Sequence, residues 1–368
     1  MSAKGSRRPL DGVRVVSLAE QYPGPFATLI LSDLGADIIQ VERPGVGDPA
    51  RAYSAFYDSL NRGKRSIALD LKNESDLSTC RELIATADVL IEGFRPGVMD
   101  RLGLGHDVIQ GDSPNLVYVS VSGFGQDGPS RLRPAHDLSF QALAGMLPTD
   151  APEVPSLSYA DLCAGMFAAI ATLGGLTGRA SSGHGGYWDV SMFDSLVSIM
   201  TTLLAPAANG AAPGTLGQDP GYGIFAGADG RWLTLSVAFE DHFWDPLCDA
   251  LSLGALRHIK GAERVQRQDE LRAALAERIS TADASVWESK LVDVGVPCGV
   301  VNSPIDVLHD PQVVSRGMFQ TLSTAAGDTT YVRQPLVVDG AQLGPTRPAP
   351  AIGEHTAEIM AELRQRRR

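Results

Sequence analysis

His136 and Asp161 are the two side chains of this sequence best suited to chemistry. His136 stands beside Asp137 where the chain turns apolar, and Asp161 begins an apolar run, residues 162–176, that contains no charged side chain. Low-dielectric surroundings raise the pKa of a carboxyl group and suit it to nucleophilic attack or proton transfer. Two other interpretations remain open: Asp161 as a helix N-cap or dipole partner, and His136 as a core histidine with its hydrogen bonds satisfied.

The composition is that of a globular protein that works on small molecules. The 368 residues are 44% hydrophobic and 20% charged, and this length favours two domains. The net charge of −12 argues against nucleic acid or an anionic membrane as the main partner. The most apolar helical run is shorter than a membrane span, so we expect a buried helix there.

The cysteines and the N-terminus indicate a reducing compartment. Cys80, Cys163, Cys248 and Cys298 are scattered, with neither the spacing of a disulfide framework nor that of a metal site. Residues 1–9 are polar and basic, without the apolar core of a secretion signal. We therefore expect a cytoplasmic protein with no metal.

Alternating strands and helices must position these side chains. Apolar runs typical of buried strands occupy residues 13–18, 36–41, 66–71, 89–91 and 116–121, and helical segments occupy residues 25–34 and 77–87. This alternation predicts an α/β fold with a parallel, Rossmann-like sheet. No G-x-G-x-x-G motif follows the first strand, which disfavours a dinucleotide cofactor and a dehydrogenase.

The composition changes in the second half of the chain. We expect a large α/β domain over residues 1–205, a linker over 206–223 rich in Gly, Pro and Ala, a small α+β domain over 224–318, and a C-terminal return to the large domain over 319–368. One amphipathic helix is predicted over residues 263–279. The run 147–157, dense in proline and acidic residues, is interpreted as a loop that closes over the site.

A set of motifs in register resembles family III CoA-transferases, the group that also contains the α-methylacyl-CoA racemases. The matching segments are PLDGVRV (9–15), Gly24-Pro25, LGADIIQVER (34–43), RGKRSIALDLK (62–72), FRPG (94–97), Gly165-Met166, GVPCG (295–299), HDP (309–311) and GEHT (353–356). The resemblance implies an interlocked homodimer. It also implies a large domain whose parallel sheet is built from both chain ends, with the small domain coming from the middle of the chain.

The resemblance further implies that coenzyme A is bound as part of the substrate, with no permanently bound cofactor. The residues at the family's CoA-binding positions are Tyr22, Pro23, Arg43, Leu69, Asp70, Leu71, Lys72, Phe94, Arg95 and Arg101. Arg43, Lys72 and Arg101 follow predicted strands, at the loop ends where open α/β sheets bind ligands. The alternative for each cation is a solvated surface side chain.

By the same resemblance, Asp161 falls at the family's catalytic aspartate. In the transferases that carboxylate attacks an acyl-CoA thioester, so that CoA moves to a small carboxylic acid through an aspartyl intermediate. In the racemases it exchanges the α-proton with a histidine as the second base, here His136, with Glu240 at the position that supports the histidine. Glu240 is equally suited to a helix start. We favour transfer, because the residues that follow Asp161 are transferase-like.

A CoA-ester-binding protein without catalysis is the third interpretation. It is disfavoured by a carboxylate in charge-free surroundings, which suits proton transfer better than structure. No motif fixes the acyl group or the acceptor acid.

Overall fold

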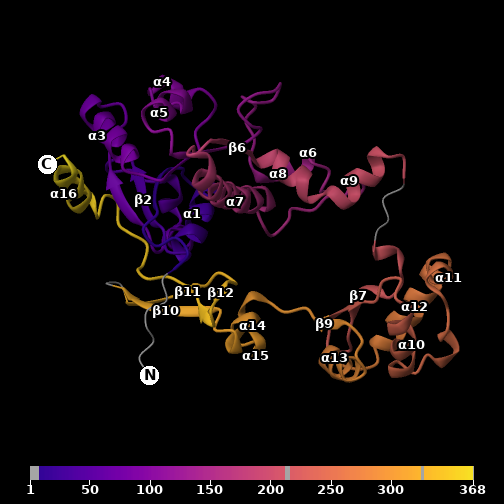
Figure 1. Cartoon of the computed structure of the whole chain (residues 1–368). Coiled ribbons are helices and arrows are strands. Elements are labelled where there is room, and N and C mark those ends of the chain that lie inside the picture. Colours follow the sequence, from indigo (N-terminus) through magenta and orange to yellow (C-terminus); the bar gives the residue numbers. More distant parts are fainter. Residues whose placement is uncertain (1–7, 212–215, 325–326, 368) are drawn as a thin grey trace. The chain divides into compact units, whose positions relative to one another are not determined.

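Two compact units make up the computed structural model, which describes residues 8–211, 216–324 and 327–367. The large unit comprises Met1–Thr201 and Ser315–Arg368, and the small unit comprises Thr202–Val314 (Figure 1). The predicted linker, residues 206–223, includes residues 212–215, which lie outside the described residues. The described part of that segment begins within helix α9 (Thr201–Ala208) and reaches the first strand of the small unit.

A six-stranded parallel sheet forms the centre of the large unit. Its strands are β1 (Arg14–Leu18), β2 (Asp37–Glu42), β3 (Arg65–Ala68), β4 (Val89–Glu92), β5 (Val117–Ser122) and β6 (Tyr187–Ser191). Their order is β3-β2-β1-β4-β5-β6, so the strand order reverses between β1 and β4. The predicted α/β fold with a parallel sheet is therefore confirmed. In such sheets the carboxyl ends at the reversal point form a ligand-binding crevice.

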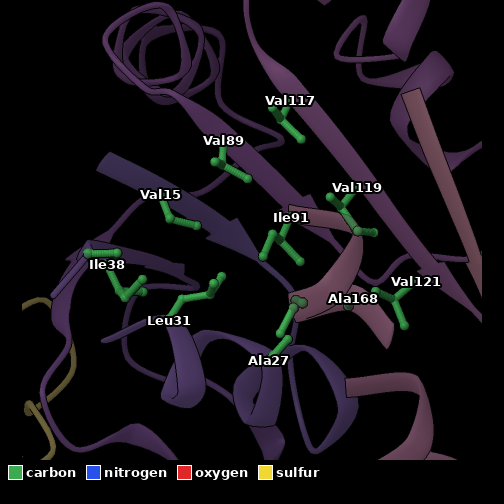
Figure 2. Close-up of a cluster of buried hydrophobic side chains, with 14 of the residues drawn as sticks. Val15, Ala27, Leu31, Ile38, Val89, Ile91, Val117, Val119, Val121 and Ala168 are labelled. Atoms are coloured by element: carbon green, nitrogen blue, oxygen red, sulfur yellow. The ribbon is translucent and has the colours of Figure 1, made fainter. Parts of the chain in front are cut away.

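Helices pack on both faces of this sheet. The helices of the large unit that precede its C-terminal segment are α1 (Pro23–Asp33), α2 (Ser54–Asn61), α3 (Glu74–Ala85), α4 (Val98–Arg101), α5 (His106–Asp112), α6 (Asp137–Leu143), α7 (Tyr159–Ser182) and α8 (Met192–Ile199), with a 3₁₀ turn η1 (Pro49–Ala52). Side chains alternate between the faces, as the two-residue period of a strand requires. Figure 2 shows one face, where Ile91 and Val119 of the strands gather with Ala27, Leu31 and Ala168 of the helices.

Helix α7 packs against α1 and the sheet at small residues. A Cβ atom on Gly165 would lie 2.8 Å from the carbonyl oxygen of Pro23, and one on Gly175 would lie 2.5 Å from a methyl group of Val117. By length and composition alone α7 could cross a membrane, but half of its apolar window is buried. That burial agrees with the buried helix expected from the sequence.

The C-terminal segment belongs to the large unit but adds no strand to the described six-stranded sheet. It forms two antiparallel pairs, β10 (Phe319–Thr324) with β11 (Gly327–Val332) and β12 (Val337–Val338) with β13 (Ala341–Gln342), and ends in helix α16 (Thr356–Arg366). The prediction that both chain ends build the parallel sheet is therefore wrong.

The backbone of edge strand β3 explains this difference. The Ser66 carbonyl accepts a hydrogen bond from the His355 amide at 2.9 Å, and the Ser66 amide donates to His355 Nδ1 at 3.3 Å. The Ala68 amide donates to Thr356 Oγ1 at 3.1 Å. These contacts occupy the backbone amide and carbonyl groups on the open side of β3. The start of α16 therefore covers the edge to which a further strand would have to bind.

The small unit is a separate α+β body. Strands β7 (Tyr222–Ala226), β8 (Trp232–Ser236) and β9 (Cys298–Val300) form an antiparallel sheet. Its other elements are η2 (Leu216–Gln218), α10 (Asp241–Ala250), η3 (Gly254–Leu256), α11 (Gly261–Gln266), α12 (Gln268–Ile279), α13 (Ala284–Asp293) and α14 (Pro304–Leu308); α15 (Pro311–Ser315) crosses the boundary between the units. The core surrounds the buried Trp244 and Trp287.

The single helix predicted over residues 263–279 is wrong, because the chain breaks between α11 and α12. The break falls at Arg267, whose backbone φ of −105° and ψ of 24° depart from helical values. Its guanidinium joins the two short helices by pairing with Glu263 at 3.0 Å and with Glu270 at 2.7 Å.

Candidate active site

A cavity of about 210 Å³ lies at the carboxyl ends of the strands where the sheet order reverses. Leu18 ends β1, Gly93 and Phe94 follow β4, and Met192 follows β6; all four line the cavity. The remaining lining residues are Glu20, Gln21, Pro23, Ala135, His136, Asp137, Phe140 and Asp161. We call this space the Asp161 cavity. It brings His136 and Asp161 together, as their chemistry requires.

Asp161 lies in the first turn of α7 but does not cap the helix. The N-cap residue is Ser158, whose side chain makes no capping hydrogen bond. The Ala160 amide instead donates to Asp137 Oδ1 at 2.7 Å, so a carboxylate from another helix supplies the cap. The N-cap interpretation of Asp161 is therefore wrong, which leaves its carboxylate available to the cavity.

The surroundings of Asp161 raise its pKa to about 7. Burial is the larger cause, and the negative charge of Asp137 is the second. Both effects disfavour the ionised form, whereas the nearby start of α7 favours it. A carboxyl group of this kind exists in both protonation states near neutrality, which suits nucleophilic or acid–base work.

Asp137 is held by its own hydrogen bonds. Its Oδ2 accepts from Gln141 Nε2 at 2.5 Å, and the same amide nitrogen donates to the Leu157 carbonyl at 3.3 Å. Gln141 is fully buried, so the contact is fixed by packing. In the sequence Asp137 is the neighbour of His136. That spacing does not reveal that Asp137 lies near Asp161 and caps the helix that carries it.

His136 is the N-cap residue of α6, and its side chain is exposed toward the cavity that it lines. Its imidazole has no hydrogen bond or ion pair within the part of the chain that the structure describes. The interpretation of His136 as a satisfied core histidine is therefore wrong. The ring is free to meet a ligand in the Asp161 cavity.

A second cavity, of about 270 Å³, continues from the first and shares Leu18, Glu20 and Phe94 with it. We call it the CoA cleft, because most of the residues at the family's CoA-binding positions line it: Arg43, Leu69, Asp70, Leu71, Lys72 and Phe94. Val41, Val98 and Leu102 add apolar walls. Two exposed cations beside apolar walls suit a ligand that carries phosphates and a nonpolar arm.

The other predicted CoA contacts lie elsewhere. Pro23 lines the Asp161 cavity, and Arg95 lines a third, smaller cavity. The Tyr22 ring packs edge-on against Phe56 at 5.0 Å between centroids, and its pKa is raised by burial and then by the charge of Asp161, so Tyr22 also borders the site. Arg101 ends α4 and lines none of these three cavities.

Glu240 belongs to the small unit, where it is the N-cap residue of α10 with an exposed side chain. The sequence left open whether Glu240 starts a helix or supports His136. The helix start is confirmed. Because His136 belongs to the other unit, the contact between the two residues stays a prediction.

Two acidic side chains of the site were missed from the sequence. Glu20 lines both the Asp161 cavity and the CoA cleft, and burial followed by the charge of Asp48 raises its pKa. Burial raises the pKa of Glu92 to about 7; its carboxylate accepts from the Phe94 amide at 2.8 Å and is bonded to the Ser120 hydroxyl. Glu92 thereby fixes the wall at Phe94. The signal available in the sequence was a charged residue, Glu92, at the end of the apolar run that forms β4.

Within the described ranges, no group of three His, Cys, Asp or Glu side chains is arranged to hold a metal ion. The chemistry that the arrangement offers is that of a half-buried carboxylate, a free imidazole and a cleft with two cations.

Fold and site together define an α/β protein with a carboxylate of raised pKa in a cavity that adjoins a cleft with two cations. The chain matches the model of CoA-transferase family III over residues 10–356. It therefore belongs to CoA-transferase family III, and the resemblance noted in the sequence is confirmed.

Three relatives illustrate the likeness. The acetyl-CoA:oxalate CoA-transferase of Acetobacter aceti is 35% identical over 378 residues, which cover 96% of each chain. The succinyl-CoA:glutarate CoA-transferase of Mus musculus is 32% identical over 381 residues, covering 97% of this chain and 87% of that protein. The crystal structure of a CAIB/BAIF family protein from Brucella suis superposes with a TM-score of 0.85 at 32% identity, covering 97% of this chain and all of that one (100%).

Proposed function

We propose that this protein is a CoA-transferase that moves CoA from an acyl-CoA thioester to a carboxylic acid through a covalent intermediate on Asp161. One observation carries the proposal: Asp161, with its pKa raised to about 7, lines a cavity that shares three wall residues with the CoA cleft. A thioester whose nucleotide lies in the cleft can thus extend its carbonyl carbon toward this carboxylate. The names of the relatives support the reaction class.

The steps follow from the chemistry of a carboxylate nucleophile. The ionised Asp161 carboxylate attacks the thioester carbonyl, and the C–S bond breaks to release CoA as a thiolate, which leaves a mixed anhydride. The thiolate then attacks the Asp161 carbonyl of that anhydride, which forms an aspartyl-CoA thioester and releases the donor acid. The acceptor carboxylate reverses both steps: it attacks the aspartyl thioester, and the expelled thiolate takes the acceptor acyl group, so Asp161 is regenerated.

The raised pKa of Asp161 serves this reaction. A carboxylate that is poorly solvated is more reactive than one in water. Near pH 7 a substantial fraction is still ionised. Partial burial thus leaves an available nucleophile.

Small dicarboxylic acids are the proposed substrate class. One relative is named for oxalate and another for succinyl-CoA and glutarate, and each is more than 30% identical to this chain over nearly its whole length. Arg131 and Arg133, near the Asp161 cavity, have no carboxylate partner within the described residues and suit an anionic acid.

Racemisation of a 2-methylacyl-CoA is the second candidate. The observation that favours it is the free imidazole of His136 in the same cavity as Asp161. In that reaction one group would take the α-proton while the other returns it from the opposite face.

One sample separates the two reactions. The purified protein is incubated with a 2-methylacyl-CoA in deuterated water, without an acceptor acid, and followed by proton NMR and mass spectrometry. A hydroxylamine-sensitive adduct on Asp161 without α-deuteration supports transfer, and it should vanish in Asp161→Asn. Deuterium at the α-carbon that is lost in His136→Ala but kept in His184→Ala, a change at an exposed histidine outside the cavities, would establish racemisation instead.

We also propose that the chain is a cytoplasmic homodimer. Apolar side chains on the large unit support an interface, because Ile170 is 59% exposed on α7 and Ile199 is 44% exposed on α8. Light scattering coupled to size exclusion measures the mass directly. A dimer that Ile170→Glu weakens supports the proposal, and a wild-type monomer at micromolar concentration contradicts it.

A further inference from the structure

A third cavity, of about 140 Å³, opens beside the Asp161 cavity at the carboxyl ends of β4 and β5. The two spaces share Gly93, Phe94, Ala135, Phe140 and Met192 as walls. We call this third space the arginine recess, because Arg95, Arg131 and Arg133 all line it. No acidic side chain is among its lining residues.

The three guanidinium groups are not neutralised by the protein. Within the described residues, none of them has a carboxylate within ion-pair distance. In a chain with a net charge of −12, three arginines without a carboxylate partner give this small cavity a local positive charge that suits an anion. Arginine is the side chain best suited to carboxylates, because its planar donors form two parallel hydrogen bonds.

Arg133 contacts an aromatic cluster beside the recess. The Arg133 guanidinium lies over the Phe124 ring at 5.9 Å from its centroid, and the Phe124 ring packs on Phe140 at 5.0 Å between centroids. Phe140 is 1% exposed and is a shared wall of the two cavities. Arg133 therefore contacts the same aromatic packing that shapes the Asp161 cavity.

Ser122 provides an independent observation that points to a ligand. The residue lines the recess and is 6% exposed, and its buried hydroxyl has no hydrogen-bond partner in the described part of the chain. A buried hydroxyl without a partner costs about 1–3 kcal/mol. A carboxylate in the recess would accept its proton and remove that cost.

We propose that the arginine recess binds the second carboxylate of a dicarboxylic substrate while the first reacts at Asp161. Arg131 and Arg133 supply the charge, and Ser122 supplies a neutral donor. This inference rests on the proposed CoA transfer. The recess, of about 140 Å³, is the smallest of the three cavities described, which suits a carboxylate better than a long acyl chain.

The position of the recess favours a carboxylate over a CoA phosphate. The phosphates of CoA are separated from its sulfur by the whole pantetheine arm, and the CoA cleft has Arg43 and Lys72 for them. The recess instead adjoins the cavity in which the reacting carbon must lie. The arginines of the recess can therefore bind the second carboxylate of an acid whose first carboxylate reacts at Asp161.

Calorimetry on the whole protein tests the recess without turnover. Succinate, glutarate and butyrate are titrated separately into protein saturated with free CoA. We expect saturable binding of at least one dicarboxylate and at least tenfold weaker binding of butyrate, which has a similar length but one charge. Because a charged hydrogen bond contributes about 1.5–3 kcal/mol, Arg131→Gln and Arg133→Gln should each weaken the binding of the dicarboxylate by about 10- to 150-fold.

Matched variants keep this result specific. Arg364→Gln removes one exposed charge from α16, away from the recess, and should leave the titration unchanged. Ser122→Ala should weaken binding of the dicarboxylate by a smaller factor. Arg133→Lys should bind the dicarboxylate more tightly than Arg133→Gln but less tightly than the wild-type protein. Arg131 and Arg133 are exposed, so their variants retain the fold.

Three outcomes would overturn the inference: equal affinity for butyrate and the dicarboxylates, loss of dicarboxylate binding when CoA is present, or affinities that the arginine variants do not change. The second would assign the recess to a phosphate of CoA. Failure of the proposed reaction is distinct, because it appears as absence of the Asp161 adduct whether or not the recess binds an acid.

Discussion

Asp137 caps the helix that carries Asp161 and at the same time raises the pKa of Asp161. Its Oδ1 accepts the Ala160 amide at 2.7 Å, and its negative charge is the second cause, after burial, of the raised value of about 7. One carboxylate thus fixes the helix start that carries Asp161 and adjusts the ionisation of Asp161. The two effects can be separated, because capping needs only an oxygen acceptor whereas the pKa effect needs a charge.

The variant Asp137→Asn keeps the capping oxygen and removes the charge. We expect the pKa of Asp161 to fall, though not to the ordinary value of a carboxyl group, because burial remains the larger cause. If ionised Asp161 is the nucleophile, the acidic limb of kcat/KM against pH then moves to lower pH. At pH 6 a carboxyl group with a pKa of 7 is only about one tenth ionised, so the variant gains up to several-fold in kcat/KM there.

Two controls accompany Asp137→Asn: the basic limb of the profile of kcat/KM against pH, and the thermal stability of the variant. A folded variant with an unchanged basic limb assigns the shift to Asp161. An acidic limb that stays in place would show that the charge of Asp137 does not govern the nucleophile.

Asp161→Asn is expected to stabilise the protein in a pH-dependent way. The folded protein holds the Asp161 proton more tightly than the unfolded chain does, since its pKa is raised from 3.8 to about 7. The wild-type protein is therefore at its most stable, with respect to this group, below the unfolded value, and it loses that stability as pH rises through about 7. Asp161→Asn has no titrating group at this position and therefore does not lose stability as the pH rises.

The melting temperatures of the two proteins across pH measure this difference. They should nearly coincide around pH 4, diverge up to about pH 7 and then run parallel, with the variant higher by roughly 2 °C or more. A constant difference at every pH would contradict the raised pKa of Asp161. His184→Ala, a change at an exposed position, serves as the control for titration outside the site.

The sequence predicted the sheet and most of the site because both depend on local patterns. Apolar runs of strand length marked β1 to β5, and the cations of the CoA cleft follow the ends of those strands. A reactive Asp161 was indicated by an apolar run with no charge. These features need only the neighbouring residues in the chain.

The remaining features depend on contacts between distant segments. The hydrogen bond from the Ala160 amide to Asp137 joins two helices, and no sequence spacing predicts it. The edge of β3 is covered by His355 and Thr356 from the far end of the chain, which excluded a further strand there. The arginine recess was missed because Arg131 and Arg133 resemble any solvated loop cations until the unpaired Ser122 appears beside them.

Asp33 and Arg62 form a buried ion pair whose loss should be costly. The two groups meet through two contacts, 2.5 Å and 2.8 Å, and each side chain is 1% exposed. Arg62 also donates to the Val332 carbonyl at 2.7 Å, which ties α1 and the start of β3 to the C-terminal hairpin. Asp33→Ala leaves a buried, uncompensated guanidinium, so we expect destabilisation by about 3–5 kcal/mol in chemical denaturation.

The double variant Asp33→Leu with Arg62→Leu checks the explanation for this ion pair. Because it removes both charges, it should be markedly less destabilised than the single variant Asp33→Ala. A double variant that is as unstable as the sum of the single ones would mean that the pair contributes by packing alone.

Gly165 allows the close approach of α7 to α1 that places Asp161 in its cavity. A Cβ atom there would lie 2.8 Å from the Pro23 carbonyl oxygen and 2.9 Å from the Phe26 ring, so the helices must move apart. Pro23 lines the Asp161 cavity, and Asp161 lies one turn before Gly165 on the same helix. Gly165→Ala should therefore cost about 1–3 kcal/mol of stability and lower kcat as well.

Gly178, near the other end of α7, is the matched control for Gly165. A Cβ atom at Gly178 meets nothing within 4 Å, so Gly178→Ala should stabilise the helix by about 0.5–1 kcal/mol and leave kcat unchanged. Denaturation and initial rates on both variants make the comparison. If both alanines stabilise the protein and neither changes kcat, then close packing of α7 on α1 does not position the nucleophile.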